Sequence, residues 1–168
     1  MKKLRFFIKI GIIFVLVTGS LSHFLFDWTG NNYIVGLFAP INESVWEHMK
    51  LLFFPMLLYS LFMIFRFKET CPCVAPSLLF GILAGTWLIP VFYYTYTCVL
   101  GKNVFLLDIA TFIFSVILSF WLSYRLSLSC RLKPYTHLLA VLICDLFLCF
   151  VIFTYHPPNA KIFQFPTV

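Results

Sequence analysis

Residues 42–66 read NESVWEHMKLLFFPMLLYSLFMIFR, and this stretch decides the fold class. Its first part, Asn42 to Lys50, carries carboxylates, an amide, a hydroxyl, an imidazole and an ammonium. From Leu51 to Phe65 it is apolar and uncharged. A helix that crosses a bilayer needs about 20 mostly apolar residues. The stretch therefore predicts a membrane-spanning helix with a polar beginning.

The composition of the whole chain supports this prediction. The 168 residues are 62% hydrophobic and 11% charged, with a mean hydropathy of +0.98, whereas a soluble domain has about 25% charged residues. A soluble globule is excluded. The net charge of +6 comes from short basic runs between apolar segments. We therefore expect a lipid bilayer as the surroundings and no nucleic-acid partner.

Five apolar stretches are long enough to span a bilayer, and Gly, Pro and Asn punctuate the breaks between them. We predict an all-α polytopic transmembrane bundle in which residues 1–168 form one domain. The predicted spans are 6–26, 42–66, 74–98, 104–126 and 136–156.

The basic residues predict the orientation, because Lys and Arg gather on the cytoplasmic side. Nine of the 12 fall at one end of the predicted bundle and three at the other, which places the N-terminus inside and the C-terminus outside. The first residues also have the pattern of a signal peptide. The apolar run continues through residues 23–26, however, so we expect a retained first span.

With this orientation, ionisable residues gather at the outer face, whereas Asp145 lies near the middle of the fifth span. Such groups in a span usually face the bundle interior or a wet cavity, and shallow ones can reach water instead. Snorkelling suits Lys50, His48 and Asp108 less well than the others. The outer set is His23, Asp27, Glu43, Glu47, His48, Lys50, Asp108 and His156.

The polar beginning of the second span is expected to be amphipathic. At 100° per residue, Glu43, Ser44, Glu47, His48 and Lys50 share an arc of about 160°. Asn42 is the expected N-cap, and capping would explain Glu43 as well. Capping does not explain His48 or Lys50.

Imidazoles and carboxylates at one face suit a divalent metal such as Zn²⁺. The predicted metal ligands are His23, His48, His156 and Glu47. Asp27 lies four residues after His23, on the same side of the helix, and could orient its imidazole. The residues predicted to carry chemistry are Glu43, Glu47, His48, Ser44, Lys50 and Asp108. The reaction expected of such a site is hydrolysis or group transfer on a membrane-proximal lipid or small molecule.

Other interpretations remain open. Ser44 could be a nucleophile with His48 as its base. Lys50 could balance the carboxylates in a structural ion network of a non-enzymatic scaffold, partner subunit or binder. Asp145 could serve passage of protons or solutes.

Small residues and cysteines have plainer interpretations. We expect Gly81 and Gly85 to serve helix packing, and we expect the same of a stripe of mostly small polar residues in the fourth span. Cys71, Cys73 and Cys130 fall in loops on the predicted cytoplasmic side, where thiols normally stay reduced. The stripe is Asp108, Thr111, Ser115, Ser119 and Ser123.

Residues 40–50 resemble the signature P-[VI]-N-E-S-x-W-E-H-x-K of an uncharacterised family of small bacterial integral membrane proteins. The segments SHFLFDWTG (22–30) and TYHPPNAKIF (154–163) resemble other parts of that family. The resemblance implies a helical membrane fold in the bacterial cytoplasmic membrane and implies no activity. A looser similarity, in residue inventory only, links the chain to membrane hydrolases of the alkaline ceramidase type. Those have seven spans and a paired HxxxH that this sequence lacks.

Overall fold

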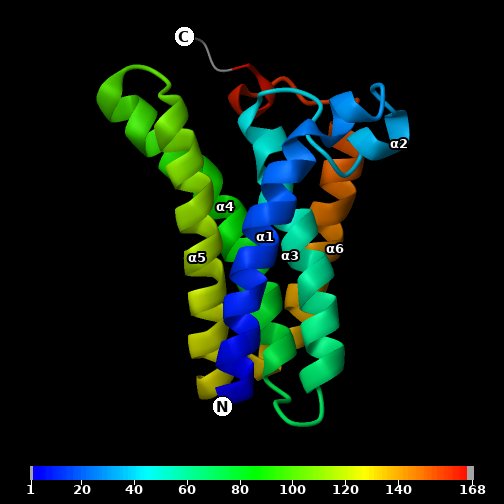
Figure 1. The fold of residues 1–168 in the computed structure, drawn as a ribbon, viewed down its shortest axis with the longest axis vertical. Coiled ribbons are helices and arrows are strands. Elements are labelled where there is room, and N and C mark those ends of the chain that lie inside the picture. The colour runs from blue at the N-terminus through cyan, green and yellow to red at the C-terminus, as the bar shows by residue number, and fades with distance from the viewer. Residues whose placement is uncertain (1, 166–168) are drawn as a thin grey trace.

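The computed structural model describes residues 2–165, and in that range it is helical without strands. Five of the helices are long and apolar enough to cross a membrane, so the chain is a multi-pass membrane protein with the predicted five-span helical bundle (Figure 1). The elements are α1 (Lys2–Trp28), α2 (Tyr33–Gly36), α3 (Val45–Phe67), α4 (Val74–Leu100), α5 (Phe105–Ser129), η1 (Lys133–Tyr135), α6 (Thr136–Phe153) and η2 (Lys161–Phe163).

The five long helices follow the predicted spans, with shifts at their ends. α1 begins at Lys2 rather than at residue 6, because a helix continues past the apolar run into the polar interface. α4 ends at Leu100 and α5 at Ser129, and the residue that follows each helix, Gly101 or Cys130, has left-handed backbone angles (φ 68° and 53°). Such a residue after the last turn is a common way for a helix to end.

Helices α3 and α4 occupy the middle of the bundle. α3 packs between α1 and α4, α4 also contacts α5 and α6, and α1 closes against α5. The outer helices therefore keep one apolar side each, suited to contact with lipid. Exposed side chains on these faces include Phe6, Ile13, Val17, Phe114, Trp121, Leu138, Val141 and Ile152.

The α4–α5 interface shows why the small residues are needed. Gly81 and Gly85 of α4 lie against Ser119 and Ser123 of α5, and a Cβ atom on either glycine would overlap a serine Oγ atom. Both serines are fully buried, and their hydroxyls donate to backbone carbonyls one turn earlier in α5. The packing interpretation of the glycines and of these serines is confirmed.

Helix α2 and η2 cover one end of the bundle and were not predicted. In Figure 1 they lie at the end opposite the N-terminus. Trp46, in the first turn of α3, joins η2 to the bundle, since its ring centroid lies 4.7 Å from that of Phe150 in α6 and 4.9 Å from that of Phe163 in η2. Glu47 and Lys50, in the first turns of α3, are enclosed by protein rather than surrounded by lipid headgroups.

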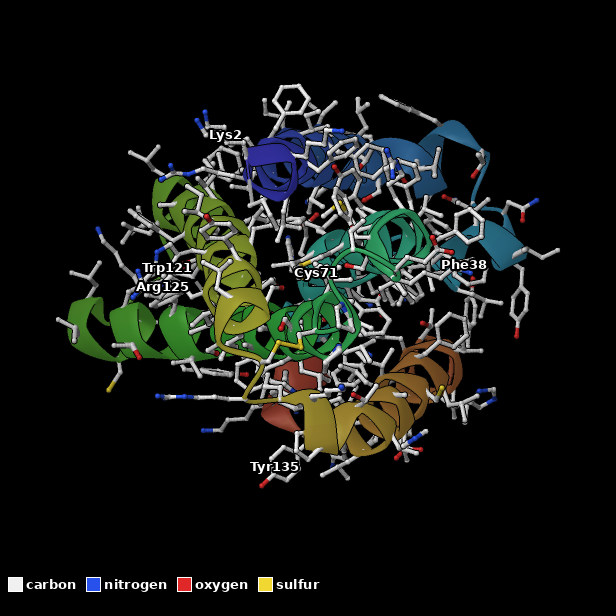
Figure 2. All side chains as sticks on the ribbon, turned by 90° about the horizontal axis from the view of Figure 1, so that it is seen from below. Lys2, Phe38, Cys71, Trp121, Arg125 and Tyr135 are labelled. Atoms are coloured by element: carbon white, nitrogen blue, oxygen red, sulfur yellow. A yellow bond between two sulfur atoms is a disulfide. The ribbon has the colours of Figure 1, made fainter. Side chains whose placement is uncertain are left out.

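A disulfide joins two loops at the other end of the bundle. Cys73, just before α4, is bonded to Cys130, just after α5 (Figure 2). The expectation of reduced thiols was therefore wrong for Cys73 and Cys130, whereas Cys71 is a free cysteine. The pairing arises because α4 and α5 are packed antiparallel along their length, which brings Cys73 and Cys130 together across 57 residues of sequence.

Candidate functional site

The signature segment is not helical from its start. Ser44, not Asn42, caps α3: its Oγ atom accepts from the backbone N–H of Glu47 at 3.3 Å. Asn42 instead accepts from the N–H of Ser44 at 2.9 Å, which makes a tight turn before the helix. The predicted N-cap was wrong because Asn and Ser both favour this role. The Asn42 side chain is engaged in the preceding turn, so Ser44 caps the helix.

This correction also changes the predicted polar arc. Glu43 and Ser44 precede Val45, the first residue of α3, so they do not share the angular spacing of Glu47, His48 and Lys50. The polar side chains of the segment separate into two groups. Glu47 and Lys50 turn into the protein, whereas Glu43 and His48 meet a residue of α1.

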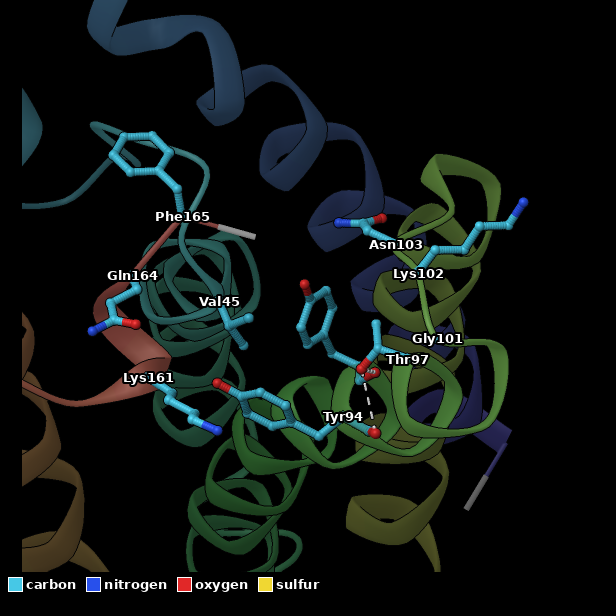
Figure 3. Close-up of a pocket in the computed structure, with 10 residues that line it drawn as sticks. Val45, Tyr94, Thr97, Gly101, Lys102, Asn103, Lys161, Gln164 and Phe165 are labelled. Carbon is cyan, nitrogen blue, oxygen red and sulfur yellow. Dashed lines mark hydrogen bonds between the residues drawn. The ribbon is translucent and has the colours of Figure 1, made fainter. Parts of the chain in front are cut away.

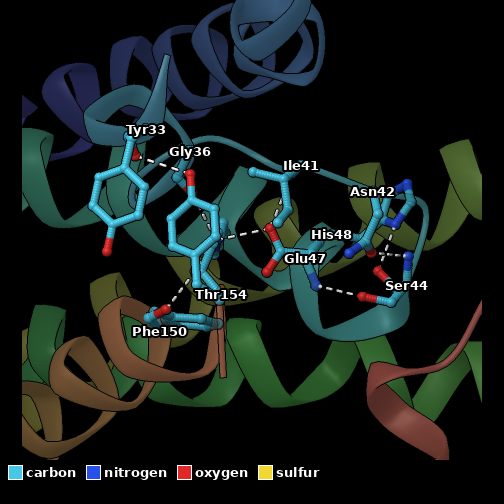
Figure 4. Close-up of polar contacts among 11 residues, drawn as sticks. Tyr33, Gly36, Ile41, Asn42, Ser44, Glu47, His48, Phe150 and Thr154 are labelled. Carbon is cyan, nitrogen blue, oxygen red and sulfur yellow. Dashed lines mark hydrogen bonds and ion pairs between the residues drawn. The ribbon is translucent and has the colours of Figure 1, made fainter. Parts of the chain in front are cut away.

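Lys50 is at the centre of the first group, the buried ion network. Figure 4 labels its partners Gly36, Glu47 and Thr154. Its Nζ atom donates to Glu47 Oε2 at 2.7 Å, to the Gly36 carbonyl at 3.0 Å and to Thr154 Oγ1 at 2.6 Å. Glu47 Oε2 also accepts from the N–H of Ile41 at 3.0 Å. The network thus ties α2, the following loop, α3 and the end of α6 together.

The ammonium of Lys50 has all three of its donors satisfied, which is what a charge needs when it leaves water. Lys50 is 0% exposed and Glu47 is 2% exposed. No sequence pattern pointed to the two neutral acceptors of the Lys50 ammonium. Gly36 lies in an unpredicted helix, and Thr154 is 104 residues away from Lys50.

The second group, here called the His/Glu cluster, consists of His23, Glu43 and His48. Glu43 Oε2 lies 3.3 Å from His48 Nε2 and 3.7 Å from His23 Nε2, and the two imidazole centroids are 5.3 Å apart. The three residues come from α1, the turn before α3, and α3. One ligand atom from each lies within 4.8 Å of the others.

Close packing of α1 on α3 brings His23 to this place. A Cβ atom on Gly19, one turn before His23, would lie 2.5 Å from the carbonyl oxygen of Leu51 and 2.7 Å from the ring of Phe112. Only glycine allows that approach, and His23 then reaches the first turns of α3. The side chains of His23 and His48 are 31% and 27% exposed, so the cluster is half-buried and open to water.

The hydrogen bonding of His48 orients its ring. Its Nδ1 atom lies 2.9 Å from the carbonyl oxygen of Ser44. A carbonyl only accepts, so Nδ1 carries the proton. In the neutral ring the Nε2 lone pair then points at the Glu43 carboxylate, and two lone pairs at 3.3 Å repel. Either a proton or a cation must lie between them.

The spacing of the three side chains is compatible with one shared metal ion. Ligands at about 2.0–2.1 Å from a tetrahedral Zn²⁺ are about 3.3–3.4 Å apart. The separations of 3.3 and 3.7 Å in the His/Glu cluster are close to that value. The Ser44 carbonyl is the partner that a zinc-bound histidine needs on its second nitrogen.

Glu43 is the most exposed member, with 60% of its side chain accessible. When His48 carries a proton on both nitrogens, its Nε2–H donates to the Glu43 carboxylate and holds the pKa of Glu43 below its ordinary value, with partial burial acting in the opposite direction. A carboxylate that stays ionised is ready to bind a cation.

The remaining predicted residues lie elsewhere. Asp108 accepts a hydrogen bond from Tyr96 of α4. Asp27 and His156 are exposed and are not among the three residues placed to share an ion. The Ser44 hydroxyl caps α3, and within residues 2–165 it makes no hydrogen bond to His48.

Asp145 is exposed in the middle of α6 and lies apart from both groups. Its neighbours on the outer side of the helix are apolar, among them Val141, Leu142 and Leu148. Among the residues that the structure describes, Asp145 has no hydrogen bond or ion pair through its side chain.

Comparison with known families places the chain. The model of a family of unknown function, DUF6512, matches residues 1–166. The chain belongs to this family. No curated protein and no solved structure matches it. Membership of DUF6512 supplies no activity, so the chemistry has to be argued from the His/Glu cluster and its surroundings.

Proposed function

We propose that the His/Glu cluster binds a divalent metal ion such as Zn²⁺ and that the bound ion serves hydrolytic or group-transfer chemistry. The observation that supports this is the convergence of His23, Glu43 and His48 within 4.8 Å. Two imidazoles and one carboxylate leave the fourth position of a tetrahedral ion for water, which is the ligand arrangement of many catalytic zinc sites. The proposed ligand set keeps His23 and His48 and has Glu43 in place of Glu47.

The position of the cluster favours a substrate at the membrane surface. It lies near the ends of α1 and α3, where the half-buried imidazoles meet water. Zinc lowers the pKa of a bound water to about 7, so hydroxide is available at neutral pH. We infer that the substrate is a lipid or small molecule at the extracytoplasmic face of a bacterial cytoplasmic membrane. The distribution of Lys and Arg and the family resemblance support that location.

Zinc binding by the full chain, purified in detergent without a His-tag, tests the proposal. After chelation, the protein should take up one equivalent of Zn²⁺, measured by plasma mass spectrometry. His48→Ala and Glu43→Gln should lose that equivalent, and His156→Ala should keep it. Stoichiometric zinc in all four proteins, or in none, would exclude the cluster as the metal site.

The second candidate is a non-enzymatic membrane protein, such as a scaffold, a partner subunit or a binder. The buried ion network favours it, because Lys50 and Glu47 are enclosed and fully engaged in holding segments together. In this function the signature segment serves assembly of the fold. Absence of zinc uptake combined with a strong effect of Lys50 on stability would favour it over the metal centre.

A further inference from the structure

A cavity of about 310 Å³ opens at the same end of the bundle as the His/Glu cluster (Figure 3). It lies between the loop that joins α4 to α5, the first residue of α3 and the segment around η2. Its lining includes Val45, Tyr94, Lys102, Asn103, Lys161 and Gln164. Its volume lies within the range of small-molecule sites, roughly 300–1,000 Å³.

The charges of this cavity all have one sign. Lys161 of η2 extends into the cavity, whereas Lys102 of the α4–α5 loop lies at its rim with its ammonium turned away (Figure 3), and both are exposed. Neither makes an ion pair within residues 2–165, and the described lining has no Asp or Glu. Asn103 and Gln164 add amide donors, and Tyr94 adds a hydroxyl. Such a set is suited to an anion with several acceptor oxygens.

The depth of the cavity points to the source of the anion. Its lining includes the last turns of α4, the loop after them and the first residue of α3, which is where a spanning helix leaves the hydrocarbon core. Phosphate groups of membrane lipids occupy this depth, and basic side chains there are attracted to anionic lipids. Val45 and Phe165 offer apolar surface beside the two lysines.

We propose that this cavity binds a phosphate group at Lys161, with the Lys102 side chain turning in from the rim, and that the phosphate comes from an anionic lipid headgroup or from free phosphate. The binding itself needs no metal. Val45 lies between Glu43 and His48 in sequence, so a phosphate ester held here would lie next to the first turn of α3. If the proposed metal centre acts as a hydrolase, its substrate would then be a phosphate ester, and this last step rests on the proposed function.

The test measures retention of phosphatidic acid on the full chain by native mass spectrometry in detergent. Diacylglycerol with the same acyl chains is the matched control, because it lacks only the phosphate. We expect phosphatidic acid to be retained and diacylglycerol to be lost. Lys102→Gln with Lys161→Gln should weaken phosphatidic acid binding about twenty-five-fold, from a roughly fivefold effect of each lysine. Lys133→Gln, at the other end of the bundle, should leave it unchanged.

Inorganic phosphate separates the two sources. Displacement of phosphatidic acid by millimolar phosphate, with the same dependence on the two lysines, would identify free phosphate as sufficient. Lysine-dependent retention that phosphate does not disturb would identify the lipid. Equal retention of both lipids, or no effect of the double substitution, would overturn the proposal. Zinc uptake by the double variant is measured in parallel and should be normal, so a failure here differs from a failure of the metal centre.

Discussion

The Nε2 atom of His48 lies 3.3 Å from the Oε2 atom of Glu43, on the ring edge opposite the nitrogen bound by the Ser44 carbonyl. That arrangement fixes which nitrogen of His48 is free. It also brings a carboxylate against a lone pair, a contact that a shared cation stabilises. His23 joins the same oxygen from another helix. The metal-centre proposal depends on this contact.

Substitutions of Ser44 distinguish a helix-capping role of its hydroxyl from a nucleophilic role. Ser44→Ala removes the hydroxyl that caps α3, which costs about 0.5–2 kcal/mol of stability. It leaves the backbone carbonyl that orients His48, so zinc affinity should change by less than about threefold. Isothermal titration with Zn²⁺ and thermal unfolding measure the two effects. Ser44→Asp, which can still cap, should recover the stability. Loss of zinc binding in both variants would contradict this assignment.

Lys50 and Glu47 should show the behaviour of a buried ion pair. Lys50→Met leaves the Glu47 carboxylate without its cation, and we expect a loss of about 3–5 kcal/mol in the free energy of unfolding. Removing both charges together, as Glu47→Leu with Lys50→Met, should cost less than Lys50→Met alone. Denaturant titration in mixed micelles measures these values. Lys68→Met, on an exposed side chain, is the matched control, and an equal effect there would contradict the interpretation.

Zinc binding should weaken as the pH falls. Each imidazole must be free of its metal-facing proton to bind Zn²⁺, so protons compete with the metal for His23 and His48. Glu43 adds no competition near neutral pH, because its pKa lies below the ordinary carboxyl value. Zinc titrations between about pH 8 and pH 5 should show a steady decline in affinity. A pH-independent affinity would contradict imidazole ligation.

Glu43 also predicts a small acid-side effect on the metal-free protein. A carboxyl with a lowered pKa in the folded state stabilises the fold above its unfolded pKa, and this contribution is lost as the pH falls through the lower, folded value. Glu43→Gln should therefore reduce stability at neutral pH and flatten its decline in acid. The effect is modest, because more than half of this side chain is exposed. Thermal unfolding of the wild-type protein and of Glu43→Gln, from neutral pH down through the acid side, checks this effect on stability.

Asp145 should destabilise the isolated chain. Its carboxyl is exposed in the middle of α6 and meets apolar surroundings, and an ionisable group at the centre of a span costs roughly 2.5–3.5 kcal/mol on insertion scales. Asp145→Leu is expected to raise the unfolding temperature, and Asp145→Asn should raise it less. Asp27→Leu, near the end of α1, should give no gain. A large loss of stability in Asp145→Leu would reveal a structural partner.

Cysteine labelling tests the orientation that the basic residues predict. Cys98 lies near the outer end of α4 in that orientation, and Cys71 lies in the opposite loop. An impermeant maleimide added to intact cells should label a variant that keeps Cys98, and should label one that keeps Cys71 only after permeabilisation. The Cys73–Cys130 disulfide makes this test important, because disulfides persist mainly in oxidising compartments. The reverse labelling pattern would invert the bundle.

The spans could be predicted because apolar length is a local property of the sequence. Residues such as Leu51 to Phe65 leave few alternatives to a membrane helix. The convergence of His23 with His48 followed from polarity and depth, but the choice of Glu43 over Glu47 did not. That choice depends on where the helix begins. Because Ser44 and not Asn42 is the N-cap, Glu43 lies in the turn before α3 and Glu47 lies in its first turn.

Long-range partners were the part that the sequence did not reveal. The Gly36 carbonyl has no side-chain signature, and Thr154 looks like any hydroxyl at a helix end. The Cys73–Cys130 pair required knowledge that α4 and α5 are packed side by side. In each case the contact depends on tertiary packing, which residue spacing within one helix does not contain.

X-ray absorption spectroscopy of the full chain loaded with one equivalent of zinc tests the metal centre most directly. We predict a first shell of nitrogen and oxygen at about 2.0–2.1 Å with imidazole scattering from two histidines. His23→Ala should lose one imidazole, and His156→Ala should lose none. A shell containing sulfur at about 2.3 Å, or one without imidazole, would contradict the assignment of His23, Glu43 and His48 as the ligands.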